Sequence, residues 1–330
     1  MRTRRGVIGA AGAAALGTLG GFGARAQSAG AAANYPDRSV RIIVPFGAGG
    51  GNDILARTYG QKLGAQFGQT FVVENRPGAF GRVGIEAVMH SRPDGYTLGV
   101  HPSGPILMDR GAEKPPYDLA EDLVPVAMLG SFAVLLLVAA DAPFRTLADL
   151  IAWEKSNKGK GNFGTGGADL RFAMEMLNQR AGTSFEYIAY RSSVEAINAA
   201  ASRDTTLAVA DTGPAIAALE GKRVRALAVV APQRLSLLPE VPTTAEAGYP
   251  GIDVRFWIGL FAPAGTPPEV VAKLSGAVAE ASRAADLRER LAGVAMSAEG
   301  MGAAPFRQLI QHDAQVWRDV AEQAGVPLVR

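Results

Sequence analysis

The chain contains no cysteine, only three histidines among its 330 residues, and 19% charged residues. The absence of cysteine excludes disulfide bonds, a thiol nucleophile and a lipid anchored through a thiol. His90, His101 and His312 have no metal-like spacing, and neither a G-x-S-x-G nor an H-E-x-x-H motif occurs. We therefore expect no catalytic residue, no bound metal and no cofactor, so the chain is not expected to be an enzyme.

An excess of basic residues is also missing outside the first 26 positions. The whole chain has 33 basic and 31 acidic residues, a net charge of +2. Four of the basic residues lie within positions 1–26, and no acidic residue precedes Asp37, so the remainder has 29 bases, 31 acids and a net charge of −2. This balance removes the main reason to expect a nucleic-acid partner.

Residues 1–26 have the three parts of a secretory signal peptide. Arg4 and Arg5 are followed by an uncharged stretch over 6–24 and by the sequence Ala24-Arg25-Ala26, which predicts cleavage after Ala26. The paired arginines and the glycine-rich centre favour the twin-arginine route over the Sec route. An uncleaved membrane anchor is the alternative, but seven glycines in this stretch disfavour it.

The export signal predicts a soluble protein of the periplasm, in which residues 27–34 form a flexible leader. No other apolar run is long enough to span a membrane, since the longest, 132–140, has the length of a strand.

Strand and helix patterns alternate after residue 35, which is typical of parallel sheets covered on both faces. Expected strands lie at 40–44, 71–74, 96–100, 132–138, from 162, and at 185–189, 206–210, 225–230 and 255–262. Expected helices lie at 54–67, 85–90, 146–156, 170–180, 194–202, 215–220, 268–284, 286–292 and 305–324. Since no Pro/Ser-rich linker separates the two halves, we expect two α/β lobes joined by crossover strands, one formed by 35–131 plus 250–330 and the other by 132–249.

A glycine-rich loop, Phe46 to Asp53, separates the first expected strand from the first expected helix. Without Cβ atoms its backbone amides can turn toward one point, and the helix dipole adds partial positive charge there. This arrangement suits a phosphate or a carboxylate, although a purely structural turn is the alternative. No lysine follows Gly51, which argues against a nucleoside triphosphate.

Two features of the second half have the same position at strand ends. Thr165-Gly166-Gly167 resembles the first loop, and Arg171 in the following helix is placed either to pair with a ligand carboxylate or to face solvent. Asp211 follows a buried strand, where it either accepts from a ligand amine or hydroxyl or caps the next helix. Ligands of open α/β sheets bind at the carboxyl ends of strands, so a cleft between two lobes is expected to hold the ligand.

Several motifs, in order along the chain, resemble the substrate-binding proteins of tripartite tricarboxylate transporters, also called the Bug family. They are Pro45-Phe46-x-Ala48-Gly49-Gly50-x-x-Asp53, Val73-Glu74-Asn75-Arg76-Pro77-Gly78-Ala79, Pro93-Asp94-Gly95-Tyr96-Thr97-Leu98, and the stretch from Trp257 to Pro267. The resemblance implies a type II periplasmic binding fold, whose two lobes close on a ligand. It also implies a monomeric, non-enzymatic receptor that captures a small carboxylate and delivers it to a two-component membrane permease.

By motif position, the resemblance assigns the ligand carboxylate to the first glycine-rich loop and places further contacts on four other loops. The candidate ligand-binding residues are Phe46, Gly47, Ala48, Gly49, Gly50, Asp53, Ser103, Gly104, Thr165, Gly166, Arg171, Tyr190, Asp211 and Thr212.

Three departures from the family pattern lie in the second half. The segment 164–171 is about two residues shorter than its family counterpart, 189–192 replaces P-Y-K-G, and Asp211-Thr212 replaces D-N. Asp169 and Arg171 are therefore either specificity residues of this chain or residues outside the cleft. Dicarboxylates, tricarboxylates, amino acids and aromatic acids all remain candidate ligands, and a periplasmic sensory partner or a periplasmic enzyme remains an alternative function.

Overall fold

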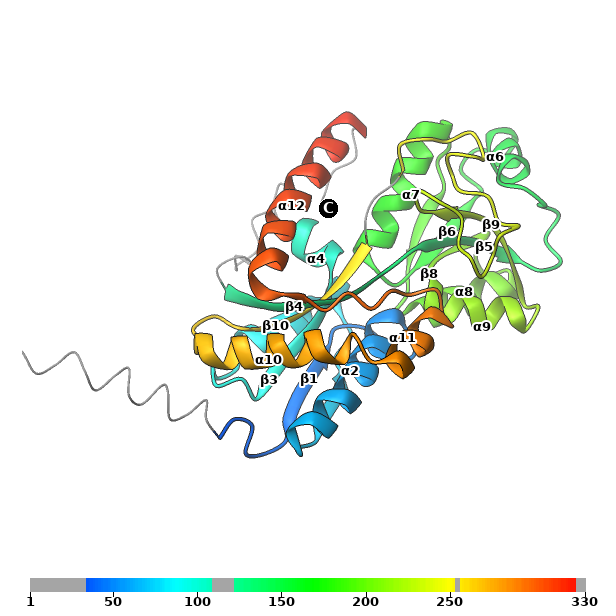
Figure 1. Ribbon diagram of the computed structural model, residues 1–330. Coiled ribbons are helices and arrows are strands. Elements are labelled where there is room, and N and C mark those ends of the chain that lie inside the picture. Colours follow the sequence, from blue (N-terminus) through cyan, green and yellow to red (C-terminus); the bar gives the residue numbers. More distant parts are fainter. Residues whose placement is uncertain (1–33, 109–121, 253–255, 325–330) are drawn as a thin grey trace, which may run out of the picture.

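The computed structural model describes residues 34–108, 122–252 and 256–324, which form two β-sheets flanked by helices (Figure 1). The expected signal peptide and nearly all of the expected leader lie outside the described residues. Among the described residues, no helix combines the length and the apolar character needed to cross a membrane.

The first sheet has six strands in the order β11-β4-β10-β3-β1-β2. The strands are β1 (Val40–Val44), β2 (Phe71–Asn75), β3 (Thr97–Pro102), β4 (Leu123–Phe132), β10 (Phe256–Pro263) and β11 (Met301–Gly302). Strands β2, β1 and β3 run parallel, and β10 is antiparallel to both β3 and β4. We call this sheet with its helices the first lobe.

Helices cover both faces of the first sheet because its strands are buried on both sides. Ile42 contributes to one core cluster and Ile43 to another, since successive strand side chains point to opposite faces. The Ile42 cluster includes α2 (Gly51–Phe67), α10 (Pro268–Ala281) and α11 (Ala285–Ala292). The Ile43 cluster includes α3 (Arg82–Met89) and α12 (Ala303–Ala324). A 3-10 turn, η1 (Ala79–Gly81), and a short helix, α4 (Ser103–Met108), complete this lobe.

The second sheet has five strands in the order β7-β6-β8-β5-β9. The strands are β5 (Val134–Ala139), β6 (Asn162–Thr165), β7 (Glu186–Ala189), β8 (Leu207–Asp211) and β9 (Val224–Val230). Its helices are α6 (Leu147–Ser156), α7 (Ala168–Ala181), α8 (Ser193–Ser202) and α9 (Thr212–Glu220). We call this unit the second lobe. The predicted α/β class is confirmed, and most predicted elements are present with shifted ends.

The two sheets repeat one pattern of strand pairing. Each has three parallel strands followed by an antiparallel strand that comes from elsewhere in the chain, β10 in the first lobe and β5 in the second. Only Ala133 separates β4 from β5, so the chain enters the second lobe directly from one strand into the next (Figure 1). It returns through residues 231–255, which contain no helix among the positions described. The lobe limits predicted from the sequence stay a prediction.

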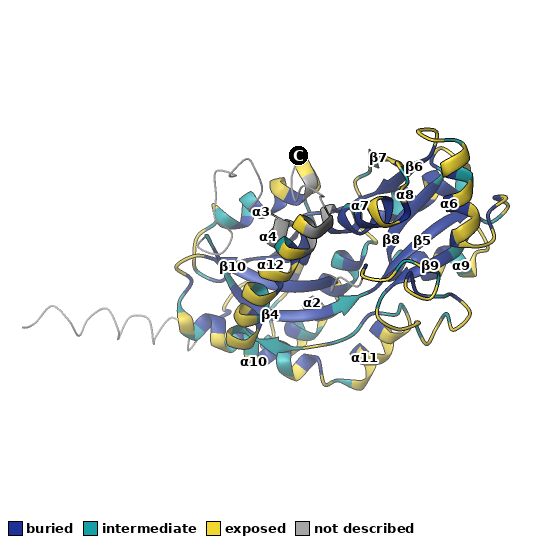
Figure 2. Ribbon diagram, turned by 90° about the horizontal axis from the view of Figure 1, so that it is seen from above, coloured by how far each residue is buried: buried dark blue, intermediate teal, exposed yellow. Residues whose placement is uncertain are grey.

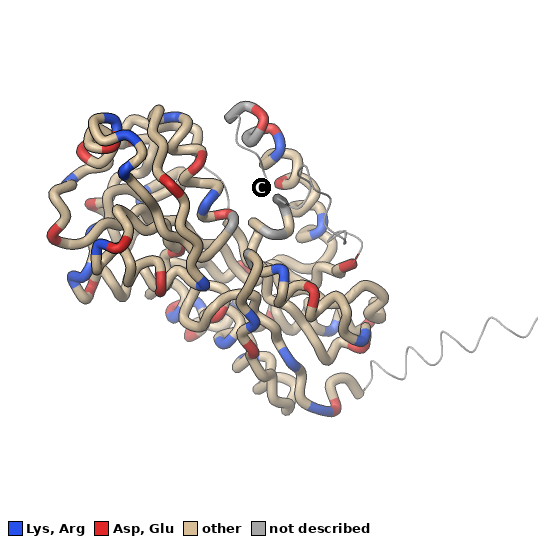
Figure 3. Tube along the Cα trace, turned by 180° about the vertical axis from the view of Figure 1, so that it is seen from behind, with Lys and Arg blue, Asp and Glu red and all other residues tan. Residues whose placement is uncertain are grey.

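The structure corrects two expected elements near the crossing and the first loop. The single strand expected over 132–138 is wrong, because Phe132 ends β4 while Val134 begins β5. Helix α2 begins at Gly51 and not at Ile54, so the last glycine of the loop belongs to its first turn. Figure 2 shows that strands are almost wholly buried and helices are exposed on their outer faces. Figure 3 shows positive and negative residues interspersed over the described chain.

Gly84 allows α3 to pack against the end of β1. A Cβ atom at this position would lie 2.6 Å from the Cα atom of Pro45. We expect Gly84→Ala to lower the free energy of unfolding by about 1–3 kcal/mol, because backbone and not a flexible side chain has to move. Urea unfolding followed by circular dichroism measures the change.

The matched control is Gly276→Ala in α10, where a Cβ atom would meet nothing within 4 Å. The free energy of unfolding of this control is expected to rise by about 0.5–1 kcal/mol, the usual preference of a helix for alanine over glycine. An unchanged urea midpoint for Gly84→Ala would contradict the packing argument.

Candidate functional site

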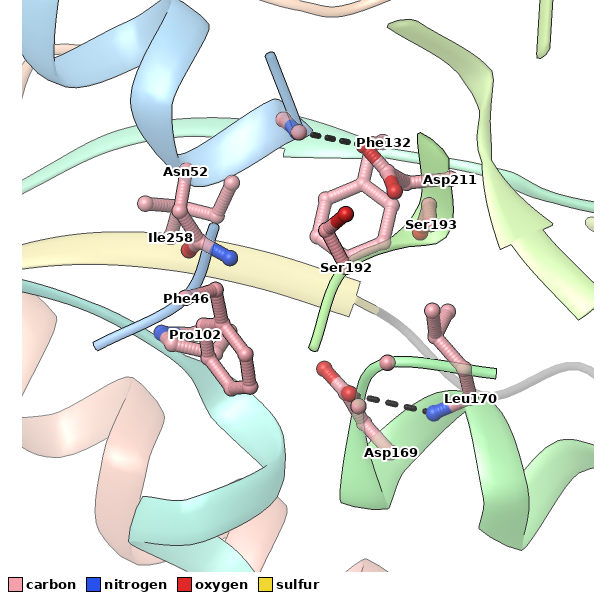
Figure 4. Close-up of a pocket in the computed structure, with 14 residues that line it drawn as sticks. Phe46, Asn52, Pro102, Phe132, Asp169, Leu170, Ser192, Ser193, Asp211 and Ile258 are labelled. Carbon is pink, nitrogen blue, oxygen red and sulfur yellow. Dashed lines mark hydrogen bonds between the residues drawn. The ribbon is translucent and has the colours of Figure 1, made fainter. Parts of the chain in front are cut away.

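A cavity lies between the two lobes, at the carboxyl ends of strands from both sheets. Its volume is about 30 Å³. The lining residues are Phe46, Gly50, Gly51, Asn52, Pro102, Phe132, Gly166, Gly167, Asp169, Leu170, Ser192, Ser193, Asp211 and Ile258 (Figure 4). In this closed arrangement there is room for no more than a few water molecules.

Three helices of ten or more residues begin at this cavity. Their first turns contribute Gly51 from α2, Asp169 from α7 and Ser193 from α8 to its walls. The free amides at a helix N-terminus and the helix dipole together favour negative charge. The cavity therefore offers an anion three sources of partial positive charge from different elements.

Asp53 fixes the conformation of the glycine-rich loop through hydrogen bonds. Its carboxylate accepts hydrogen bonds from the amide of Gly49 at 3.0 Å, from Arg57 Nε at 2.9 Å and from Asn75 Nδ2 at 3.0 Å. Asn75 Nδ2 also donates to the carbonyl of Phe46 at 3.0 Å. Burial by itself would raise the pKa of Asp53, but the hydrogen bonds from Arg57, Gly49 and Asn75 outweigh it and lower the pKa. Asp53 thus acts on the loop and is not part of the cavity wall.

Asp211 at the end of β8 joins the lobes. Its Oδ2 accepts a hydrogen bond from the backbone amide of Gly51, the first residue of α2, at 2.6 Å. The amide of Gly47 donates to the carbonyl of Arg191 at 3.1 Å, which adds a second bond between the lobes. Burial raises the pKa of Asp211, and hydrogen bonds from Ser193 and Gly51 oppose the rise. A carboxylate of the protein itself therefore occupies the N-terminus of α2 when the lobes are closed.

Asp169 in the first turn of α7 is 2% exposed and faces the cavity (Figure 4). Its Oδ1 accepts a hydrogen bond from the amide of Leu170 at 3.0 Å. Its Oδ2 is buried and has no hydrogen-bond partner within the described part of the chain. Burial raises the pKa of Asp169 to about 6; the amide of Leu170 opposes the rise, and the charge of Asp211 adds to it.

Four of the residues predicted to bind a ligand line the cavity, namely Phe46, Gly50, Gly166 and Asp211. The other ten lie outside the lining: Gly47, Ala48, Gly49, Asp53, Ser103, Gly104, Thr165, Arg171, Tyr190 and Thr212. Their contact with a ligand stays a prediction, and the closed structure gives several of them other contacts.

The contacts of these residues are chiefly structural. Ser103 Oγ accepts from the amide of Trp257 at 3.4 Å, and the hydroxyl of Thr212 donates to the carbonyl of Ala295 at 3.1 Å. Tyr190 packs its ring against Gly164, and Ala48 is exposed.

Arg171 points away from the cavity. It pairs with Glu175 at 3.3 Å, and its guanidinium lies 4.7 Å from the centre of the Tyr187 ring. Of the two residues that sequence comparison with the family pattern singled out, the cavity wall therefore includes Asp169 and not Arg171.

Sequence reasoning did not propose nine of the lining residues as ligand contacts. They are Gly51, Asn52, Pro102, Phe132, Gly167, Leu170, Ser192, Ser193 and Ile258. Most of them directly follow strands or begin helices, so extending each predicted loop by one or two residues would have included them. Phe132 and Ile258 lie on β4 and β10 near the crossing, and no motif marks them.

The chemistry of the lining is that of a binding site. Of the residues that the structure describes, Asp169 and Asp211 are the only ionisable ones in the lining, and no described lysine, arginine or histidine belongs to it. Within the described ranges no three histidine or acidic side chains gather in a way that would hold a metal ion. Amides, hydroxyls and carboxylates are available to orient a small polar ligand.

Comparison with known sequences gives one consistent family. Residues 55–326 match the family described as the tripartite tricarboxylate transporter family receptor. Protein BugT of Bordetella pertussis is 32% identical over 300 residues, which cover 89% of this chain and 91% of BugT. A UPF0065 protein from the tcbD-tcbE intergenic region of Pseudomonas sp. strain P51 is 32% identical over 287 residues, covering 86% of this chain and 85% of that protein.

Solved structures agree with the sequence relatives. MatC from Rhodopseudomonas palustris with bound malate is 31% identical, with a TM-score of 0.81 over 87% of this chain and 99% of MatC. An R. palustris protein with adipate is 28% identical, with a TM-score of 0.85 over 89% of this chain and 99% of its own. The periplasmic binding protein BugD is 28% identical, with a TM-score of 0.84 and the same coverage. These similarities confirm the expected fold of periplasmic binding proteins.

Proposed function

The chain belongs to the receptor family of tripartite tricarboxylate transporters, and from this premise we propose that it captures a small carboxylate between its lobes in the periplasm and passes it to a two-component membrane permease. The observation that carries this proposal is the meeting of three helix N-termini at one interlobe cavity, because such termini bind anions. The similar structures with bound malate and with adipate support a carboxylate as that anion.

Capture requires the lobes to separate first. The closed cavity admits only a few water molecules, so a ligand as large as a dicarboxylate enters an open form. Opening breaks the bonds from Gly51 to Asp211 and from Gly47 to Arg191, and it exposes the N-terminus of α2 to the ligand. The ligand then stabilises a closed form by binding both lobes at once.

The predicted site residues have different parts in this proposal. Phe46, Gly50, Gly166 and Asp211 contact the ligand directly, and Asp53 holds the first loop in shape. The motifs of residues 1–26 further suggest export and cleavage after Ala26, and the mature protein acts as a monomer in this proposal.

A screen of carboxylates against the protein purified from the periplasmic fraction tests the proposal. A ligand at about 100 times its Kd adds about 2.7 kcal/mol to the free energy of unfolding. For a protein of this size the midpoint of thermal unfolding then rises by a few degrees. We expect such a rise for one chemical class of carboxylate, with the ligand recovered chemically unchanged.

Two results would contradict the proposal. One is a protein retained in the cytoplasm, and the other is a protein whose thermal midpoint no carboxylate changes and which releases no carboxylate on denaturation.

A further inference from the structure

Asp169 presents an oxygen atom to the cavity that no group of the described protein satisfies. The side chain is 2% exposed, and its Oδ2 has no hydrogen-bond donor among the described residues. A buried carboxylate oxygen without a hydrogen-bond partner is unfavourable, so such an atom in a binding cavity indicates a partner supplied by the ligand.

The surroundings of Asp169 hold its side chain in this position. A Cβ atom on Gly104 would lie 2.6 Å from the Cβ atom of Asp169, and one on Gly167 would lie 2.6 Å from its Oδ1. Two glycines therefore leave the space that the side chain occupies. Figure 4 shows the carboxylate directed into the space between Phe46 and Ser192.

The charges around the cavity do not neutralise Asp169. Among the described residues no lysine, arginine or histidine lines the cavity, and the second carboxylate there, on Asp211, is bound by the amide of Gly51. Backbone amides, those of Leu170 and Gly104 among them, bond the Asp169 carboxylate, but its Oδ2 keeps no hydrogen-bond partner among the described residues. A cation is thus the missing complement, and the described residues provide no cluster suited to a metal ion.

We propose that the ligand carries an ammonium group which binds Asp169, so that this receptor selects amino-bearing carboxylates over the unsubstituted acids. The proposal rests on the proposed function, since the carboxylate of the same ligand binds at the helix N-termini. An ammonium fits because it carries a full positive charge and three donors. A hydroxyl provides a donor but leaves the buried charge unpaired.

Matched pairs of acids test this selectivity by isothermal titration calorimetry on the full mature protein. The pairs are succinate and aspartate, glutarate and glutamate, and adipate and 2-aminoadipate, with 1,4-diaminobutane as an amine that lacks a carboxylate. In the pair that binds best we expect the amino acid to bind about ten- to a hundred-fold more tightly, the usual effect of a hydrogen bond to a charged group.

Asp169→Asn then tests the residue itself. The variant keeps the shape of the side chain and removes its charge, so the preference for the amino acid over its unsubstituted counterpart is expected to fall about ten-fold or more. Asp169→Ser is a second variant without the carboxylate. The matched control is Glu175→Gln, which removes one negative charge from the same helix but pairs with Arg171 outside the cavity lining. The control is expected to retain the preference.

The results distinguish the inference from the proposed function. Unsubstituted acids that bind as tightly as their amino counterparts, or a preference that survives both Asp169 variants, overturn the inference and leave carboxylate capture in place. An equal loss of preference in Glu175→Gln also overturns it, since a negative charge outside the cavity would then account for the preference. Binding of 1,4-diaminobutane alone overturns carboxylate capture, and binding of none of these probes overturns the inference.

Discussion

Replacing Asp169 by asparagine is expected to raise the free energy of unfolding at pH 8 by up to about 3 kcal/mol. Burial raises the pKa of this carboxyl to about 6, well above the ordinary value of an aspartate, which is about 3.9. One pKa unit corresponds to about 1.4 kcal/mol, so a rise of about two units gives this upper figure. Asparagine removes the buried charge but keeps an oxygen that can accept the hydrogen bond from the Leu170 amide.

The stabilisation expected for Asp169→Asn increases with pH. A carboxyl whose pKa is higher in the folded state binds its proton more tightly when folded. The folded state therefore loses stability relative to the unfolded state as the pH rises from about 4 to 6, and the full penalty is present above about pH 7. The advantage of Asp169→Asn should thus be largest at pH 8 and close to zero near pH 4.

Urea unfolding of the ligand-free protein and the variant at pH 8 and pH 4 measures this difference. Glu175→Gln is the control, because its side chain is partly exposed and its loss should change stability by less than about 1 kcal/mol at either pH. A variant that is less stable than the parent at pH 8 would show that Asp169 is paired in solution.

Replacing Gly51 by alanine is expected to weaken ligand binding by about ten- to a hundred-fold while leaving each lobe folded. A Cβ atom at Gly51 would lie 2.5 Å from Oδ2 of Asp211 and 3.2 Å from Cε of Met296. Overpacking of this kind costs about 1–3 kcal/mol, which here falls on the closed form alone. The helix itself tolerates the change, since alanine favours helical conformation more than glycine does.

Small-angle scattering and calorimetry separate closure from folding. With a saturating carboxylate, Gly51→Ala should keep a larger radius of gyration than the parent and an unchanged circular dichroism spectrum. Gly60→Ala in the same helix is the matched control, because a Cβ atom there meets its nearest neighbour, Cδ1 of Ile42, at an ordinary 3.5 Å. Parent-like affinity and scattering for Gly51→Ala would disprove the role of this contact in closure.

Local signals in the sequence predicted those elements whose cause is local. The helix after Thr146 is an example, because Thr146 Oγ1 accepts from the amide of Asp149 at 3.1 Å and Asp149 accepts from the amide of Thr146 at 2.9 Å. Both bonds join Thr146 and Asp149, three residues apart, which is the spacing of a capping box. The sequence therefore predicts them directly. The glycine-rich loop between β1 and α2 was predictable for the same reason.

The sequence did not predict β4, because the contacts that allow a proline and a glycine within this strand come from residues distant in the sequence. Pro125 and Gly130 interrupt its sequence, and both usually argue against a strand interior. Pro125 pairs with Phe261 of β10 beside a register irregularity, and no β11 residue pairs with it. Gly130 is needed because a Cβ atom there would collide with the carbonyl oxygen of Ser297.

The choice between Asp169 and Arg171 also depended on information that a short motif does not contain. Helix α7 begins at Ala168, two residues before the expected start, which places Asp169 in the first turn. Two residues along a helix rotate a side chain by about 200°, so Arg171 lies on the far side. An error of two residues in the helix start was therefore enough to leave the orientation of both side chains open.

The position of β10 late in the sequence affects how the chain folds during synthesis. This strand lies between β3 and β4, yet it consists of residues 256–263. Until those residues have left the ribosome, β3 and β4 each keep an edge that lacks its native partner, and such edges invite association with other chains. The pairing of β3 and β4 with β10 thus awaits nearly four fifths of the polypeptide, so a nascent chain of this protein depends on protection of those edges until β10 has been made.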